Sequence, residues 1–170
     1  MSRLWLVLPL LFLCAAAPAP ATGPGPDIGT VTKLPVPRFV SLRSDLVNFR
    51  AGPGFQYPVS WVYQRQGLPV EIIGEFDVWR QVLAPDGGTG WVHEATVRAR
   101  RTFYVTASQA VLHSAPTPGS GALAYLNQGV SGKLLFCAAS SDFCKVEAGS
   151  KTGYLARTDL WGVFPGETVK

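Results

Sequence analysis

The same short pattern of residues occurs twice in this chain, and corresponding positions are separated by a near-constant offset, as Val47 is from Val111 and Gly67 from Gly129. Each copy has an apolar run that ends near a proline, then an isolated glycine, a second apolar run, and a glycine followed by an aromatic residue. The first copy contains Val47 to Pro53, Gly67, Trp79 to Val82 and Gly90 to Val92. The second contains Ala110 to Pro116, Gly129, Cys144 to Val146 and Gly153 to Leu155. This repeat length predicts two tandem copies of one small β module, and not a solenoid of shorter units.

The start of the chain has the features of a secretory signal peptide. Arg3 precedes the apolar run Leu4 to Leu13, and small residues follow as far as Ala21. A positive start, a short apolar stretch and a small-residue exit are typical of such peptides. We therefore predict a signal peptide over residues 1–21, and a protein exported to the periplasm or cell envelope. The alternative is an uncleaved anchor, but the run is shorter than the roughly 20 residues that a membrane span needs.

Two cysteines remain after the predicted cleavage, because Cys14 lies in the signal peptide. Cys137 and Cys144 flank six residues between two apolar runs, so they could face each other across a hairpin. In an oxidising compartment such a pair usually forms a disulfide. The rival interpretation is a metal or redox site, but two cysteines without nearby histidines do not supply a zinc ligand set. We expect a structural disulfide and no bound metal.

Composition divides the rest of the chain. Residues 22–36 are rich in proline and glycine, so we predict a disordered arm there. From residue 38 onward, short β-rich runs alternate with turn residues, and no stretch has sustained helical periodicity. The sequence therefore predicts an all-β protein with one domain over residues 37–99, a second over 100–162 and a C-terminal tail over 163–170.

The same patterns predict individual strands and loops. In the first domain we expect strands near residues 40–42, 47–50, 59–63, 70–73, 79–83 and 90–92. In the second we expect strands near residues 102–106, 110–113, 133–137, 143–147 and 152–156. Asp86-Gly87-Gly88 predicts a tight hairpin, because glycine readily adopts positive φ. Residues 52–58 contain two prolines, which cannot donate to a β-ladder, so this segment is expected to be a long loop.

These motifs resemble the bacterial Src-homology-3-like (SH3-like) domains. The resemblance is carried by Val47 to Gly54, by the strand that Gly67 introduces, by Trp79-Arg80-Gln81-Val82 and by Gly90-Trp91-Val92. It covers roughly residues 37 to 97, and more loosely residues 101 to 162. It implies two tandem small SH3-like β-barrels, export to the cell envelope and, as in several relatives, binding of cell-wall peptide or glycan.

The second copy departs from the first. It has Leu112-His113-Ser114-Ala115-Pro116 in place of Asn48 to Pro53, so it lacks the arginine and has a shorter loop. Cys144 and Tyr154 are expected at the positions of Trp79 and Trp91. We therefore expect the first domain to be the binding one and the second to be a disulfide-braced support.

The candidate ligand-binding side chains of the first domain are Arg50, Phe55, Tyr57, Tyr63 and Trp79. Aromatic faces grip sugars, prolines and extended peptides, because they offer a large rigid apolar area at low entropic cost. Phe55 and Tyr57 lie in the proline-flanked loop, whereas Trp61 and Trp91 are expected mainly in the core. Arg50 could hold a peptide carboxylate with two parallel hydrogen bonds, or it could hold the carbonyl groups of its own loop.

No catalytic arrangement is visible in the sequence, so we expect no enzyme and no cofactor. Glu71, Glu75 and Asp77 lie near one hairpin and are interpreted as solvated carboxylates, and not as the acid and base of a glycosidase. His93 and His113 have no nucleophile in the sequence frame that a catalytic triad needs. No glycine loop followed by lysine opens a helix, which argues against binding of nucleotide phosphates.

The net charge is modestly positive, +4 for the chain and +3 once Arg3 leaves with the signal peptide. Small basic β domains can bind nucleic acid, but export argues against that partner. Arg98, Arg100 and Arg101 lie between the two domains and are interpreted as a solvated linker. Attraction to an anionic wall polymer or membrane surface is the second possibility.

The sequence thus favours a non-enzymatic module of the cell envelope that recognises the peptide or glycan of peptidoglycan. The alternative is a periplasmic adaptor that binds an extended or proline-rich segment of a partner protein. A divergent hydrolase is a third hypothesis, and it requires a pairing of residues that the sequence does not show. We expect no stable membrane span after signal cleavage.

Overall fold

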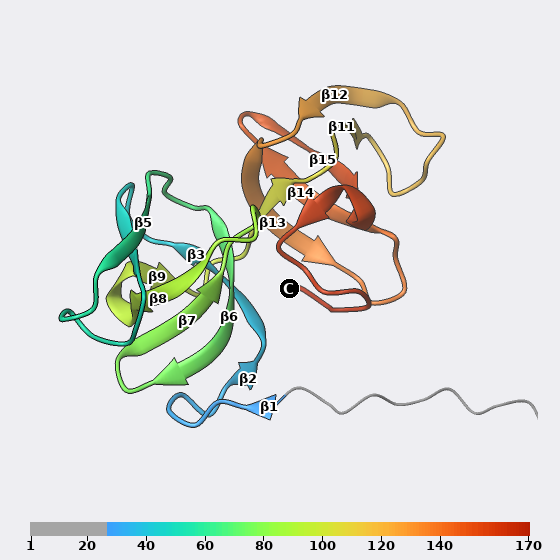
Figure 1. Ribbon diagram of the computed structural model, residues 1–170. Coiled ribbons are helices and arrows are strands. Elements are labelled where there is room, and N and C mark those ends of the chain that lie inside the picture. Colours follow the sequence, from blue (N-terminus) through green and yellow to red (C-terminus); the bar gives the residue numbers. More distant parts are fainter. Residues whose placement is uncertain (1–26) are drawn as a thin grey trace, which may run out of the picture.

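The computed structural model describes residues 27–170, so the predicted signal peptide and residues 22–26 of the predicted arm lie outside it. The described chain contains two seven-stranded sheets, one two-stranded sheet and two short 3-10 helices. The two large sheets form two lobes (Figure 1). No helix in this part of the chain is both long and apolar enough to span a membrane. The predicted all-β class is confirmed.

The two large sheets have the same strand order. The first runs β5 (Val59–Tyr63), β4 (Val47–Arg50), β8 (Thr89–His93), β7 (Trp79–Leu83), β6 (Pro69–Phe76), β3 (Arg38–Leu42) and β9 (Val97–Arg98). The second runs β12 (Ala122–Asn127), β11 (Gln109–His113), β15 (Lys151–Ala156), β14 (Phe143–Ala148), β13 (Ser131–Cys137), β10 (Thr102–Val105) and β16 (Leu160–Trp161). The strands that occupy the same place in the two sheets also occur in the same order along the chain, so that β3 corresponds to β10 and β9 to β16. The repeat seen in the sequence is therefore a repeat of topology.

Alternating side chains build one hydrophobic core in each lobe. In β4, Val47 and Phe49 are buried while Asn48 between them is exposed, because successive side chains of a strand point to opposite faces. The first core consists of Val40, Leu42, Val47, Phe49, Leu68, Val70, Ile72, Val82, Ala84 and Val92. The second consists of Phe103, Val105, Ala110, Leu112, Leu134, Cys137, Cys144, Val146, Leu155, Leu160 and Val169.

Every strand expected from the sequence is present, with ends that differ by at most three positions. The Asp86-Gly87-Gly88 turn joins β7 to β8 as expected, with Gly87 at a φ of +86°. From residue 38 onward the sequence patterns missed β9, β12 and β16. β9 and β16 have two residues each, and β12 is a largely exposed strand with two alanines, so neither length nor β propensity marks them.

Residues 27–36 are ordered, and the predicted disorder of the arm is wrong for this part. β1 (Asp27–Ile28) and β2 (Pro35–Val36) pair as a small hairpin next to the first lobe (Figure 1). The Glu75 carboxylate of β6 accepts hydrogen bonds from the Thr32 hydroxyl at 2.6 Å and from the backbone N–H groups of Val31 and Thr32 at 3.1 and 3.0 Å. Local composition could not show this order, because its source is a side chain on a strand much further along the chain.

Glu75 is a buried structural carboxylate, and its interpretation as a solvated surface group is wrong. Its side chain is 1% exposed and also pairs with Arg38 at 2.8 Å. A Cβ atom on Gly29 would collide with the carboxylate oxygens of Glu75. The hairpin therefore needs glycine at this position in order to close over the carboxylate.

The two lobes meet through Phe39 of β3. Its neighbour Val40 faces the first core, so the Phe39 side chain points to the opposite face of the sheet. Phe39 is nevertheless only 6% exposed. The ring packs against Trp161 with centroids 5.2 Å apart and against Phe164 at 4.6 Å. In return, Tyr104 of β10 packs against the first core. Each lobe therefore covers apolar surface of the other.

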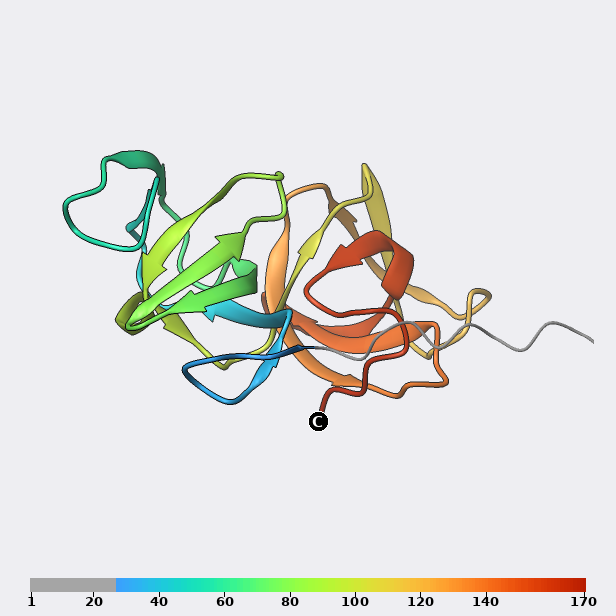
Figure 2. The ribbon, with the colours of Figure 1, turned by 60° about the horizontal axis from the view of Figure 1, so that its bottom comes forward.

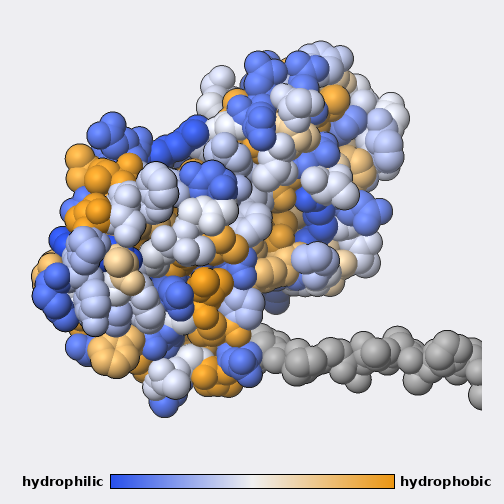
Figure 3. All heavy atoms as spheres, in the orientation of Figure 1, coloured by the Kyte–Doolittle hydropathy of each residue, from blue (hydrophilic) through white to orange (hydrophobic). Residues whose placement is uncertain are grey.

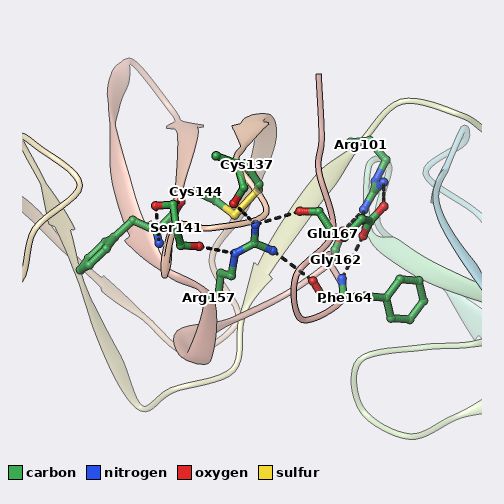
Figure 4. The surroundings of a disulfide bond; sticks show 10 residues. Arg101, Cys137, Ser141, Cys144, Arg157, Gly162, Phe164 and Glu167 are labelled. Atoms are coloured by element: carbon green, nitrogen blue, oxygen red, sulfur yellow. Dashed lines mark hydrogen bonds and ion pairs between the residues drawn. A yellow bond between two sulfur atoms is a disulfide. The ribbon is translucent and has the colours of Figure 1, made fainter. Parts of the chain in front are cut away.

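Arg101 reinforces this contact, so its interpretation as part of a solvated linker is wrong. Its guanidinium forms two hydrogen bonds with the Glu167 carboxylate, at 2.5 and 3.0 Å, and lies over the Phe39 ring. It also donates to the Gly162 carbonyl at 2.6 Å. Burial raises the pKa of Glu167, but the hydrogen bonds from Arg101 and the Phe164 N–H outweigh it, so the pKa is lowered. Figure 4 shows Arg101, Gly162, Phe164 and Glu167 in the surroundings of the disulfide.

The predicted disulfide joins Cys137 and Cys144, which are paired residues of β13 and β14. The predicted C-terminal tail returns to this hairpin, because Val169 and Cys137 exchange two backbone hydrogen bonds of 3.0 Å. Arg157 fastens the same region. It donates to the carbonyl groups of Ala138, Ser141, Phe164 and Glu167 (Figure 4).

We expect acid to release the β1–β2 hairpin. Burial raises the pKa of Glu75, but hydrogen bonds from Thr32, Arg38 and Val31 outweigh it and lower the pKa from 4.5 to about 2. A carboxyl group whose pKa is lower in the folded state stabilises that state above its ordinary pKa and loses this effect as the pH falls. The NMR amide signals of Val31 and Thr32 should move to random-coil positions between pH 4.5 and 2.

Glu75→Gln should release the hairpin already at neutral pH, whereas Glu147→Gln, which removes a more exposed ion pair, should leave the Val31 and Thr32 signals unchanged. Signals that keep their native positions in Glu75→Gln would contradict the role of this carboxylate.

We expect Phe39→Ala to separate the two lobes. Removal of a buried phenylalanine ring typically costs about 3 to 5 kcal/mol, and here the loss falls on the contact between the lobes. Urea denaturation followed by Trp fluorescence should show a lower midpoint and two transitions. Phe76→Ala removes a ring that is 59% exposed and should change the free energy of unfolding by less than about 0.5 kcal/mol. Equal effects of the two substitutions would refute the interface role.

Candidate functional site

The loop between β4 and β5, residues 51–58, projects from the first lobe (Figure 2). Its own hydrogen bonds shape it, including those from Ala51 N–H to the Pro58 carbonyl at 3.0 Å and from Tyr57 N–H to the Gly54 carbonyl at 3.2 Å. A Cβ atom on Gly52 would lie 2.5 Å from the Tyr57 ring, so glycine permits this close approach. Phe55 is 71% exposed and Tyr57 is 40% exposed. The two rings are available at the surface, as the sequence predicted.

Arg50 stands at the base of this loop and holds it. Its Nη1 donates to the carbonyl groups of Phe55 at 3.2 Å and Tyr57 at 2.8 Å, and the guanidinium lies 5.5 Å from the centre of the Phe55 ring. Of the two roles considered for Arg50, the structure therefore shows the one in which it holds the carbonyl groups of its own loop. Within residues 27–170 its Nε and Nη2 atoms make no hydrogen bond, so these N–H groups can still meet a ligand.

Phe55, Trp79 and His93 form an aromatic cluster against this arginine. The Phe55 ring meets the Trp79 ring edge-on at 5.0 Å and stacks on the His93 ring at 5.8 Å. His93 is fixed because its Nδ1 accepts a hydrogen bond from the Ala95 N–H at the start of the 3-10 helix Glu94–Thr96. A pocket of about 120 Å³ opens here, lined by Leu46, Val47, Asn48, Arg50, Phe55, Trp79, His93 and Thr96.

The structure thus brings three of the five predicted residues, Arg50, Phe55 and Trp79, into one pocket. Tyr57 lies on the loop beside them, but Tyr63 lies elsewhere. Its ring packs on Phe49 at 4.3 Å and its hydroxyl donates to Asp86 at 2.8 Å. Burial, that hydrogen bond and the Asp86 charge raise the pKa of Tyr63. Tyr63 braces the β7–β8 turn and does not line the pocket.

Trp61 was expected mainly in the core, and this expectation is wrong. It is 61% exposed on β5, next to Val59 and Val62, which are 41% and 49% exposed. β5 is the edge strand of the sheet and pairs only with β4, so little of the protein can cover its side chains. Trp91 is half-buried. Figure 3 shows apolar side chains gathered at this outer edge of the first lobe.

Sequence reasoning also missed His93 as a member of the cluster. The available signal was its position directly after Gly90-Trp91-Val92, because β8 pairs His93 with Trp79 on β7. Leu46 and Thr96 carry no such signal, since only the fold brings their segments to the pocket.

The second lobe has a different set of residues at the equivalent place. Trp79 pairs with His93 in the first lobe and Phe143 pairs with Ala156 in the second, so Phe143 occupies the position of Trp79. The expectation that Cys144 occupies it is wrong by one residue. His113 stands where the first lobe has Arg50 and meets the Phe143 ring edge-on at 5.6 Å. The second lobe therefore lacks the arginine of the pocket.

Within residues 27–170 no three His, Cys, Asp or Glu side chains lie close enough together to hold a metal ion. Glu71, the second carboxylate considered in the sequence, has its pKa raised by burial. Glu75 is fully occupied by Thr32, Val31 and Arg38.

Comparison with known protein families identifies part of the first lobe. Residues 43–99, which include β4 to β9 and the whole pocket, match the family model described as bacterial SH3 domain. The chain carries a bacterial SH3 domain. The match begins directly after β3, so the strand that holds Phe39 lies outside it.

A search of curated proteins found no match. Among solved structures, the chain is similar to NlpC2 from Trichomonas vaginalis, with 14% identity and a TM-score of 0.34 over 74% of this chain and 48% of that one. It is also similar to NlpC1 from Trichomonas vaginalis, with 14% identity and a TM-score of 0.35 over 81% of this chain and 51% of that one. The chain thus spans about half the length of these two proteins.

We expect Arg50→Ala to loosen the loop of residues 51–58 without unfolding the domain. Two charge-assisted hydrogen bonds to loop carbonyls would be lost, each contributing about 1.5 to 3 kcal/mol. Hydrogen exchange followed by mass spectrometry should show faster exchange in residues 51–58 and unchanged exchange in β6 and β7. Arg43→Ala removes an exposed arginine and should leave the loop unchanged. Equal protection of the loop in Arg50→Ala and the parent protein would show that Arg50 does not hold it.

Proposed function

We propose that this protein is a non-enzymatic binding module of the cell envelope whose first lobe recognises the peptide stem of peptidoglycan. The bacterial SH3 domain over residues 43–99 supports a binding role at the cell wall. The observation that carries the proposal is the Arg50 guanidinium, which has unused N–H groups at the mouth of an aromatic pocket.

The chemistry of this pocket suits an extended peptide that carries a carboxylate. An arginine fork forms parallel hydrogen bonds with a carboxylate, and Arg50 is held in place by the carbonyl groups of Phe55 and Tyr57. A pocket of about 120 Å³ can take one small side chain or a terminal carboxylate. Phe55 and Tyr57 then offer exposed aromatic faces to the neighbouring residues of the ligand.

We further propose that the second lobe is a second SH3-like module, that both modules are small SH3-like barrels, and that the second supports the first. Its strand order, identical to that of the first lobe, supports this assignment. Phe143 and His113 replace the tryptophan and arginine of the pocket, so binding rests on the first module. The protein then acts after export, in the periplasm or cell envelope, and needs no cofactor.

A second candidate function follows from β5. This edge strand exposes Val59, Trp61 and Val62, and an extended segment of another envelope protein could add to it as a further strand. In that case the protein is a periplasmic adaptor, and its ligand is a protein segment instead of the cell wall.

The experiment that tests the proposal is co-sedimentation of residues 22–170 with purified peptidoglycan over a salt series. We expect binding that persists at high salt, since purely electrostatic attraction is screened as ionic strength rises. The double variant Phe55→Ala with Tyr57→Ala should weaken binding by at least about tenfold, as for the loss of aromatic anchors in an interface.

The matched control is Tyr125→Ala in the second lobe, which removes a ring that is 64% exposed and should leave sedimentation unchanged. Absence of binding, or binding abolished by modest salt, would overturn wall recognition. Crosslinking of the same protein in intact envelopes to one partner protein, lost in Trp61→Ala, would then favour the adaptor. Release of soluble wall fragments would contradict a non-enzymatic role.

A further inference from the structure

A second concave site lies between the two lobes, away from the loop of the aromatic pocket. This inter-lobe cleft has a volume of about 270 Å³. Its lining residues are Gln66, Gly67, Arg98, Arg100, Thr102, Ser131, Gly132, Lys133, Glu147 and Gly149. Residues of both lobes are needed to form it, so it exists only when the lobes are packed together.

The charge in the inter-lobe cleft is positive and only partly neutralised. Lys133 pairs with Glu147 at 2.6 Å. Within residues 27–170, Arg98 and Arg100 have no carboxylate within 4.0 Å, and the ion pairs found there all belong to other residues. Two arginines without an ion-pair partner therefore line one small polar cleft whose one carboxylate is paired with Lys133, which favours entry of an anion.

Two buried polar atoms in the inter-lobe cleft also have no protein partner. The Nε atom of Arg98 and the Oγ1 atom of Thr102 are both buried and make no hydrogen bond within the described residues. Thr102 as a whole is only 6% exposed. Buried polar atoms are nearly always hydrogen-bonded in proteins, because leaving one unpaired carries a desolvation cost. Two residues that line the cleft, Arg98 and Thr102, thus each contain a buried polar atom that the protein itself does not satisfy.

The linker between the lobes explains why these arginines stand there. Arg101 is drawn into the contact with Phe39 and Glu167, whereas Arg98 at the end of β9 and Arg100 in the connection line the cleft instead. These three neighbouring arginines therefore have two different roles. One joins the lobes, and two supply charge to the cleft between them.

We propose that the inter-lobe cleft binds an oxyanion, the carboxylate or phosphate group of a small ligand or of the end of a polymer. Guanidinium forks match both groups, because each presents two acceptor oxygens at the spacing of two N–H donors. The inference does not rest on the proposed peptidoglycan recognition, since none of the residues of the aromatic pocket lines this cleft.

The test is an NMR titration of ¹⁵N-labelled residues 22–170 at constant ionic strength set with chloride. One arm uses inorganic phosphate, the second uses acetyl-alanyl-alanine with a free carboxylate, and the third uses its C-terminal amide. We expect saturable shifts of the Thr102, Ser131 and Gly132 amide signals with phosphate, with the free carboxylate or with both, and no shifts with the amide. Shifts with phosphate alone identify a phosphate site, and shifts with the carboxylate alone identify a carboxylate site.

Arg100→Gln removes an exposed guanidinium of the inter-lobe cleft and should weaken binding by at least about tenfold, as expected for a lost charge-assisted hydrogen bond. Arg43→Gln makes the same charge change on an exposed residue that does not line the cleft, and it should leave the affinity unchanged. The spectrum of each variant also shows whether its fold is intact. Absence of saturable shifts with both anions, equal shifts with the amide, or equal weakening by the two substitutions would overturn the proposal.

Discussion

The packing of Phe39 between the first lobe and the C-terminal segment of the second is the contact on which the arrangement of the protein depends. Each lobe is small, and a domain of about 60 residues buries too little apolar surface to be more than marginally stable. Phe39 on Trp161 and Phe164, with Tyr104 against the first core, adds buried surface that neither lobe has alone. The inter-lobe cleft is lined by residues of both lobes, so it too requires that the lobes pack together.

Buried charges attach the peripheral segments to this frame. Glu75 holds the β1–β2 hairpin, Arg101 and Glu167 hold the linker to the C-terminal segment, and Arg157 ties that segment to the disulfide hairpin. Each of these charged groups is paired with an opposite charge, with backbone groups or with both, which offsets much of its desolvation, although the Nε atom of Arg101 keeps no partner. The β1–β2 hairpin leaves Ile28, Val31 and Leu34 exposed, so hydrogen bonds to the buried Glu75 hold it in place of core packing. The C-terminal segment combines its hydrogen bonds with the packing of Val169 in the second core.

Much of the candidate site was readable from the sequence, and the parts that were not have a common cause. Arg50, Phe55 and Tyr57 were found because prolines and glycines mark a loop and aromatic residues within a loop are rarely needed for a core. Trp61 was misplaced, because an apolar β-branched environment predicts burial only when a second strand covers it, and β5 is an edge. His93 and Thr96 were missed, because they reach the pocket through strand pairing and a 3-10 turn and not through any local pattern.

The sequence by itself determined the all-β class, the tandem repeat, the positions of most strands and the Cys137–Cys144 pair. These follow from local periodicity, turn residues and spacing, which act over short stretches of chain. Only the tertiary structure decided the order of residues 27–36, the roles of Glu75 and Arg101, the contact between the lobes and the inter-lobe cleft. Each of these depends on groups that lie far apart in the chain, whose meeting is fixed by how the two sheets pack and by no pattern within either segment.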